Sequence, residues 1–81
     1  MVRRVRVYTQ SVELAALLKW AKVVGSGGEA KRLIQEGQVR VNGVVERHRS
    51  RRLVSGDRVE VGADTVEVVH EHGPAREVNR A

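Results

Sequence analysis

The sequence predicts an α+β fold in which two short packed helices are followed by a small, mostly antiparallel β-sheet, with one further strand at the N-terminus. From Leu14 to Ile34, apolar residues recur at three- and four-residue spacing, which is typical of amphipathic helices. From Gln38 onward they alternate with polar residues, which is typical of half-buried strands. Asn42-Gly43, within that alternating part, is the strongest short-range signal for a β-hairpin.

Length and composition favour one folded domain. The chain has 81 residues, of which 41% are hydrophobic, and it contains no internal repeat. We expect a single domain over residues 1–69 and a flexible tail over residues 70–81, a segment without periodicity that contains Gly73-Pro74. With no Phe, one Trp and one Tyr, much of the core must be valine. A domain this small has little room for a deep substrate pocket.

The first two expected elements are a strand and a helix. Residues 2–8 alternate, so that Val5 and Val7 share one face of a strand and the arginines beside them share the other. Thr9 to Ser11 then supply start signals for a helix. Its apolar stripe, at i, i+3, i+4 and i+7, consists of Leu14, Leu17, Leu18 and Ala21.

A tight turn through residues 25–28 leads into a second helix, which we expect to pack against the first. Ser26, followed three residues later by Glu29, matches a capping box. Gly37 stands where a glycine commonly ends a helix. The apolar stripe between them consists of Ala30, Leu33 and Ile34.

The remaining elements are strands joined by turns. A strand through Val39 and Val41 leads into the Asn42-Gly43 turn, and a return strand begins at Val44. After a polar stretch, turns at residues 55–57 and 62–64 precede two further strands, expected at Arg58–Val61 and Thr65–Val69.

Positive charge dominates the surface. Fifteen Lys and Arg residues stand against ten Asp and Glu residues, giving a net charge of +5, and twelve of the fifteen cations are Arg. Residues 1–9 contain three arginines and no acid, while residues 40–58 contain six arginines against Glu46 and Asp57. This balance favours a polyanionic partner, and the planar fork of Arg suits phosphate groups. The longest apolar run, Leu14–Leu18, is too short to cross a membrane.

Three motifs occur in order and at close spacing: Ser26-Gly27-Gly28-Glu29-Ala30-Lys31, Val39-Arg40-Val41-Asn42-Gly43 and Gly56-Asp57. Together they resemble the S-four RNA-binding domain, also called the alpha-L motif, and in particular its small stand-alone bacterial members. The resemblance covers residues 10–61. It implies two helices packed on a small sheet, with a face made by the second helix and the following strands that grips structured RNA, often ribosomal or transfer RNA.

The start of the second helix departs from the family in one position. Many members carry a basic residue directly after the serine, whereas this chain has Gly27. The weight of RNA contact therefore shifts to backbone amides and to Lys31. Independently of the family, a helix that begins with Gly27 and Gly28 exposes amide N–H groups, which with the helix dipole form a natural phosphate site. The alternative is that these glycines only permit a tight turn between helices.

The two cations of the second helix differ in their neighbours. Arg32 has acids at i−3 and i+4 and is expected to form surface ion pairs. Lys31 has no acid at i±3 or i±4 and is the better RNA ligand. The arginine-rich stretch that follows the hairpin is interpreted as a phosphate-binding surface rather than a merely solvated loop. The expected RNA-binding residues are Ser26, Gly27, Gly28, Lys31, Gln35, Arg40, Asn42, Arg47, Arg49, Arg51 and Arg52.

Other chemistry has little support. The chain has no cysteine, no nucleophile with an orienting base, and no paired carboxylates of a catalytic kind, so we expect no enzyme activity and no cofactor. His70-Glu71-His72 offers too few ligands for a metal site. Trp20 and Tyr8 are the only aromatic residues, which argues against base stacking and for recognition of RNA shape.

The leading hypothesis is a cytoplasmic, monomeric protein that binds structured RNA, ribosomal or transfer RNA, and associates with the ribosome. We expect it to bind neither a membrane nor a small-molecule substrate. Two alternatives stay open: an adapter whose basic face meets an acidic protein, and an accessory domain for an RNA-modifying enzyme on another chain. The leading hypothesis requires a basic face near the amides of Gly27 and Gly28, to which five side chains contribute: Lys31, Arg40, Arg49, Arg51 and Arg52.

Overall fold

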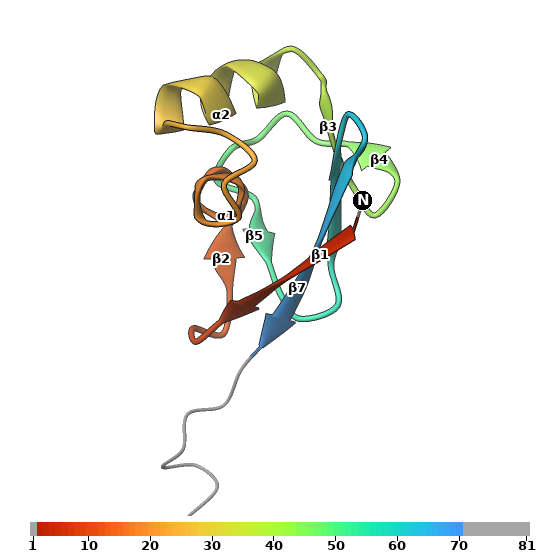
Figure 1. The fold of residues 1–81 in the computed structure, drawn as a ribbon. Helices are drawn as coiled ribbons and strands as arrows, with labels where there is room; N and C mark the ends of the chain where they lie inside the picture. Colours follow the sequence, from red (N-terminus) through yellow and green to blue (C-terminus); the bar gives the residue numbers. More distant parts are fainter. Residues whose placement is uncertain (1, 71–81) are drawn as a thin grey trace, which may run out of the picture.

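The computed structural model describes residues 2–70 as a small two-layer domain, with helices packed on a sheet (Figure 1). In chain order its elements are β1 (Val2–Val7), β2 (Val12–Glu13), α1 (Leu14–Trp20), α2 (Gly27–Gln35), β3 (Val39–Val41), β4 (Val44–Val45), β5 (Arg52–Leu53), β6 (Arg58–Val61) and β7 (Asp64–His70).

Five of the strands form one sheet in the order β1-β7-β6-β3-β4, and β2 pairs with β5 in a separate antiparallel ladder. Within the five-stranded sheet only β1 and β7 pair in parallel. Both helices lie on the same side of this sheet. Figure 1 views α1 along its axis and α2 from the side, so the two helices cross at a steep angle. The predicted α+β class and the mostly antiparallel sheet are confirmed.

The core is aliphatic and lies between the sheet and the helices. Alternation along the strands turns one side of each toward the helices, which buries the valines expected from the composition. No polar or charged residue in the described range is buried. The largest fully buried side chains are Leu14, Leu17, Leu18, Ile34, Leu53, Val7, Val39, Val59, Val66 and Val68.

Local signals predicted the second helix and the hairpin correctly. The side chain of Ser26, the N-cap of α2, accepts a hydrogen bond from the Glu29 backbone at 3.2 Å. Gly37 follows the helix with φ +77°, as a C-terminal glycine should. Asn42 and Gly43 have φ values of 52° and 85°, the two positive angles that a two-residue hairpin turn requires.

The start of α1 was predicted wrongly. Residues 9–11 do not cap the helix; the chain instead forms β2, and Glu13 makes no side-chain cap. The first helical amides are satisfied from a distant segment, since Leu14 donates to the Arg51 carbonyl at 2.9 Å and Ala15 donates to the Arg49 carbonyl at 3.1 Å. Part of the polar stretch after the hairpin is therefore not a loop but the short strand β5.

The C-terminal strand β7 runs from Asp64 to His70, one residue further at each end than expected. The rest of the predicted flexible tail, residues 71–81, lies outside the described residues, as do two members of the His70-Glu71-His72 group. Within the described part of the chain, no helix is both long and apolar enough to cross a membrane.

Candidate nucleic-acid interface

One flank of α2 carries four of the predicted site residues. Gly27, Lys31 and Gln35 follow one another at four-residue spacing and all are exposed, with Gly28 beside the first of them. Eight residues of α-helix separate the two ends of this row, a distance of about 12 Å. We call this row the α2 flank.

The beginning of the α2 flank offers two uncovered amides. Within residues 2–70, the backbone N–H groups of Gly27 and Gly28 donate no hydrogen bond. A Cβ on Gly27 would meet no atom within 4 Å, and one on Gly28 would meet only the Ser26 hydroxyl at 3.9 Å. Neither glycine has a positive φ. The turn between the helices therefore does not require glycine here, and the exposed amides at the positive end of the helix dipole are left to attract an anion.

The far end of the α2 flank carries a guanidinium. Arg47 Nη1 donates a hydrogen bond to the carbonyl oxygen of Gln35 at 3.0 Å. This carbonyl belongs to the C-terminal end of α2, the negative end of the helix dipole. The same guanidinium lies over Gly37, where a Cβ would come within 2.9 Å of Nη2. Arg47 is thus held at the end of the row that begins at Gly27.

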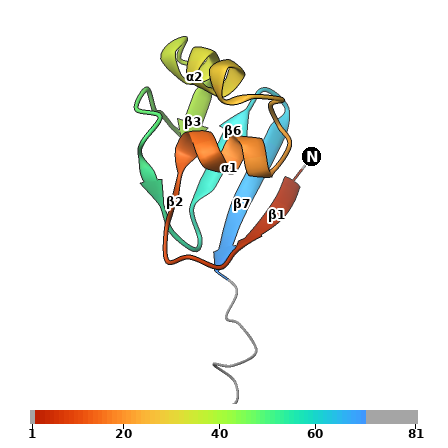
Figure 2. The same cartoon turned by 90° about the vertical axis from the view of Figure 1, so that its left-hand side faces the viewer.

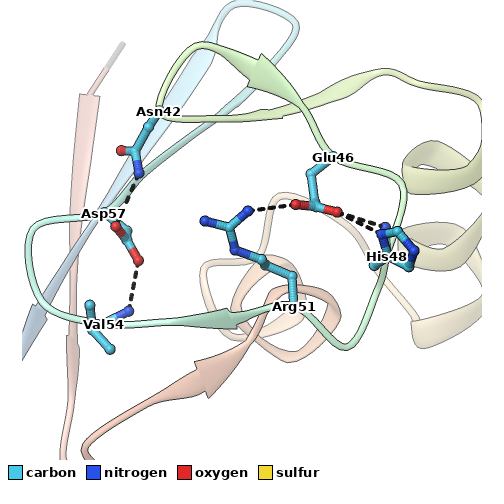
Figure 3. A network of polar contacts seen from close by, with 6 residues as sticks. All are labelled: Asn42, Glu46, His48, Arg51, Val54 and Asp57. Atoms are coloured by element: carbon cyan, nitrogen blue, oxygen red, sulfur yellow. Dashed lines mark hydrogen bonds and ion pairs between the residues drawn. The ribbon is translucent and has the colours of Figure 1, made fainter.

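Glu46 organises the arginine-rich segment, residues 47–52. Its carboxylate accepts a hydrogen bond from Arg51 Nη1 at 2.6 Å, and its other oxygen lies 3.1 Å from the His48 amide and 3.0 Å from His48 Nδ1 (Figure 3). The Arg51 side-chain hydrogen bond, followed by those of His48, lowers the pKa of Glu46 to about 2. Glu46 therefore stays charged, neutralises Arg51 and fixes the path of the segment. The sequence interpretation counted this acid only as an opposing charge; its position next to four arginines was the signal.

The other two arginines of the segment differ in how they are held. Arg52 donates to the hydroxyl of Ser11 at 3.3 Å, just before the first residue of the β2–β5 ladder. Arg49 contributes its carbonyl to the start of α1, while its exposed side chain makes no hydrogen bond or ion pair with any described residue. Of the four arginines in residues 47–52, Arg49 is the one whose guanidinium makes no hydrogen bond or ion pair within residues 2–70.

The structure brings only some of the predicted residues together. The segment holding Arg47 meets the C-terminal end of α2, so it lies about 12 Å from the amides of Gly27 and Gly28, with Lys31 between them. Arg40 stands opposite Glu60 in the strand register, on the sheet face that points away from the helices, because its neighbours Val39 and Val41 are buried.

Asn42 has a structural role. Its amide donates to one oxygen of Asp57 at 3.1 Å and its carbonyl accepts from the Arg58 backbone at 3.0 Å. The other Asp57 oxygen accepts from the Val54 backbone at 2.8 Å (Figure 3). These bonds tie the hairpin turn to the turn that precedes β6.

Two further predictions concern residues near the site. Arg32 forms an ion pair with Glu36 at 3.7 Å, as expected, but the Glu29 carboxylate instead accepts from the Gly25 amide at 2.8 Å. Among residues 2–70, no three His, Cys, Asp or Glu side chains gather in a way that could hold a metal ion.

Comparison with known proteins adds the family. A model of the S4 domain matches residues 5–69. The chain belongs to the S4 domain family. Among small S4 relatives, YbcJ of Escherichia coli strain K12 is 43% identical over 58 residues, which are 72% of this chain and 83% of YbcJ. RlbA of Bacillus subtilis strain 168, named as a probable ribosome maturation protein, is 37% identical over 71 residues, which are 86% of this chain and all of RlbA.

Solved structures of S4 relatives agree with the fold. The solution structure of E. coli YbcJ, described as revealing an alpha-L motif involved in RNA binding, superposes with a TM-score of 0.62 at 37% identity. That match covers 84% of this chain and 85% of YbcJ. The 30S ribosomal protein S4e of Thermoplasma acidophilum superposes with a TM-score of 0.65 at 26% identity over 78% of this chain. This chain spans only 33% of S4e. The resemblance to the small stand-alone members of the S4 family is confirmed.

Proposed function

We propose that this S4 protein is a non-catalytic RNA-binding protein that grips structured RNA through the α2 flank and the adjoining segment 47–52. The observation that carries the proposal is the row of exposed hydrogen-bond donors along α2. Two uncovered amides begin the row, the Lys31 ammonium stands in the middle, and the Arg47 guanidinium ends it. Such a row is complementary to a short run of phosphodiester backbone.

The segment 47–52 extends this surface. Arg49 supplies a charge that no described residue neutralises, while Arg51 and Arg52 hold the segment in place with one edge of each guanidinium. Because an Arg has five N–H donors, such a contact leaves others for phosphate. In this proposal Ser26 and Asn42 position the backbone rather than contact RNA.

Recognition rests on the shape and charge of the RNA. The α2 flank and segment 47–52 contain no Phe, Tyr or Trp, and their one imidazole, that of His48, lies 3.0 Å from the Glu46 carboxylate, so base stacking has little support there. Double-stranded RNA is recognised mostly through its backbone and its wide minor groove. A structured RNA with a regular backbone therefore suits this surface better than an extended single strand.

The names of the relatives indicate which RNA to test first. RlbA is named for ribosome maturation and S4e is a ribosomal protein, so we propose that the bound RNA is ribosomal RNA, with transfer RNA as the second choice. The protein would act as a monomer in the cytoplasm, with residues 1–69 as the RNA-binding unit.

A matched pair of variants on α2 tests the proposal. Lys31→Ala and Arg32→Ala each remove one exposed cation from adjacent positions, but Lys31 lies in the α2 flank and Arg32 is paired with Glu36. Fluorescence anisotropy with a labelled helix-loop fragment of ribosomal RNA should show a several-fold weaker affinity for Lys31→Ala and little change for Arg32→Ala. Equal losses would mean that only net charge matters. Tighter binding of polyglutamate than of RNA would instead favour the protein adapter.

A further inference from the structure

The face of the five-stranded sheet that points away from the helices carries a second group of arginines. In β1 the exposed Arg4 and Arg6 alternate with residues that face the core, and in β6 Arg58 does the same. No described helix or strand covers this side (Figures 1 and 2). We call it the outer face, and its charged residues are Arg4, Arg6, Arg40, Arg58, Glu60 and Glu67.

The centre of the outer face is a row of three charges that crosses three strands. Arg4 and Arg58 both stand opposite Glu67 in the strand register, one from each side. Arg4 Nε lies 3.7 Å and Arg58 Nη2 lies 3.9 Å from the same Glu67 oxygen. The arginine side chains are 77% and 60% exposed, whereas that of Glu67 is 24% exposed. The carboxylate is thus recessed between two guanidiniums that reach the solvent.

This arrangement leaves the arginines able to bind an anion. One carboxylate oxygen is shared by two guanidiniums at distances longer than a hydrogen bond, so both planar forks keep their donors. Arg6, two residues along β1 from Arg4, adds a third guanidinium, and Arg4, Arg6, Glu67 and Val69 together line a shallow depression. Arg4 and Arg58 together against Glu67 give the central row of the outer face a net positive charge.

The composition of the outer face fits nucleic acid better than protein. Its cations are all Arg, whose fork matches phosphate oxygens, and none of the paired strand residues on it is an aromatic residue or Met that could anchor a protein partner. Protein–nucleic acid interfaces are more polar and more positive than protein–protein ones. Glu67 then acts as a positioning residue that keeps Arg4 and Arg58 over the sheet.

We propose that the outer face binds the phosphate backbone of a second RNA segment, so that one molecule of this protein links two segments of structured RNA. The inference rests on the proposed function, since it adds a second RNA surface to the α2 flank. The two surfaces belong to opposite layers of the domain, because α2 packs on the other side of the sheet. One straight RNA helix docked on α2 therefore does not also lie across the outer face.

The test measures how many RNA molecules bind to one protein molecule. The probe is a short RNA hairpin at moderate salt, and the methods are native mass spectrometry and sedimentation. The wild-type protein should bind two hairpins. Arg4→Gln with Arg58→Gln should bind one, and so should Lys31→Ala with Arg49→Ala. A matched control, Lys19→Gln with Arg32→Gln, also removes two exposed cations but none from the outer face, and it should still bind two. Circular dichroism melting of each variant establishes that it is folded.

Glu67→Gln provides an independent arm. Removing the recessed carboxylate should tighten binding of the second hairpin several-fold without changing the first. A purely structural Glu67 would instead change melting and leave both hairpin affinities as they are.

The outcomes separate the two proposals. A wild-type protein that binds a single hairpin, with full affinity in Arg4→Gln/Arg58→Gln, overturns the outer-face site and leaves the α2 flank intact. Loss of all binding in Arg4→Gln/Arg58→Gln, with Lys31→Ala/Arg49→Ala unaffected, overturns the α2 flank instead. Polyglutamate that displaces the second hairpin and binds tighter than RNA would identify the outer face as a protein-binding surface.

Discussion

Replacing Gly37 with alanine tests how the end of the α2 flank is built. Gly37 has φ +77°, and an alanine Cβ there would lie 2.9 Å from Nη2 and 3.1 Å from Cζ of Arg47. The first cost is the left-handed backbone, about 1 to 2 kcal/mol for a residue with a Cβ. The second is displacement of the guanidinium from the Gln35 carbonyl, a cation at a helix C-terminus that contributes about 0.3 to 1 kcal/mol.

Gly43 provides the matched control. It has φ +85°, and a Cβ there would meet no atom within 4 Å, so Gly43→Ala carries the backbone cost alone. Gly37→Ala should therefore lower the free energy of unfolding by a few tenths to about 1 kcal/mol more than Gly43→Ala does. For a domain of this size that excess corresponds to roughly 2 to 8 °C in Tm.

Urea denaturation of both variants, each in the wild-type and the Arg47→Ala background, isolates the contact as a double-mutant cycle. In the Arg47→Ala background the two alanine substitutions should cost the same. Gly37→Ala should also weaken RNA binding, whereas Gly43→Ala should not. If Gly37→Ala costs no more than Gly43→Ala in the wild-type background, Arg47 is not held over Gly37 as argued here.

Three further predictions concern stability. Because the folded-state pKa of Glu46 is lowered from 4.5 to about 2, its stabilising effect is complete above pH ~5 and is lost as the pH falls toward 2. The difference in unfolding free energy between wild type and Glu46→Gln should shrink over that range; a constant difference would contradict the pairing with Arg51. Asn42→Gly keeps the positive φ and should cost about 1 kcal/mol for lost hydrogen bonds, while Asn42→Ala should cost about 1 kcal/mol more in chemical denaturation. Lys22, which follows the C-cap residue Ala21 of α1, has φ 61°; changing it to glycine should raise the free energy of unfolding by about 0.5 to 1 kcal/mol, seen as a higher Tm.

The parts of the fold that the sequence predicted well depend on residues close together in the chain. The Ser26–Glu29 cap, the glycine after α2 and the Asn42-Gly43 turn each need only a few neighbouring residues to define a backbone conformation. The same holds for Arg32, whose ion pair with Glu36 follows from helical spacing alone.

The parts that the sequence did not predict depend on distant segments. The start of α1 is capped by carbonyls of residues 49 and 51, and no local pattern around residues 9–11 records that contact. The parallel pairing of β1 with β7 joins the two ends of the described chain, so the row Arg4–Glu67–Arg58 exists only once the sheet is assembled.

The candidate site was predicted by residue type more successfully than by arrangement. Lys31 and Gln35 lie on the flank that helical spacing gives them. Arg40 lies on the outer face, because strand alternation with buried Val39 and Val41 decides its direction. Glu46 and Ser11 accept hydrogen bonds from Arg51 and Arg52, and these contacts decide which arginine side chains of the 47–52 segment lack a partner. The RNA-binding roles of these residues remain predictions.

The most direct test of the central claim is the salt dependence of RNA binding. If the α2 flank and segment 47–52 contact about three to six phosphates, log K against log salt should have a slope of roughly −2 to −5, because each contact releases counterions. Lys31→Ala with Arg49→Ala should flatten the slope by about one to two units with a near-normal Tm, while Arg32→Ala leaves it unchanged. A slope and an RNA affinity that both stay at wild-type values in Lys31→Ala/Arg49→Ala would show that this surface does not bind RNA.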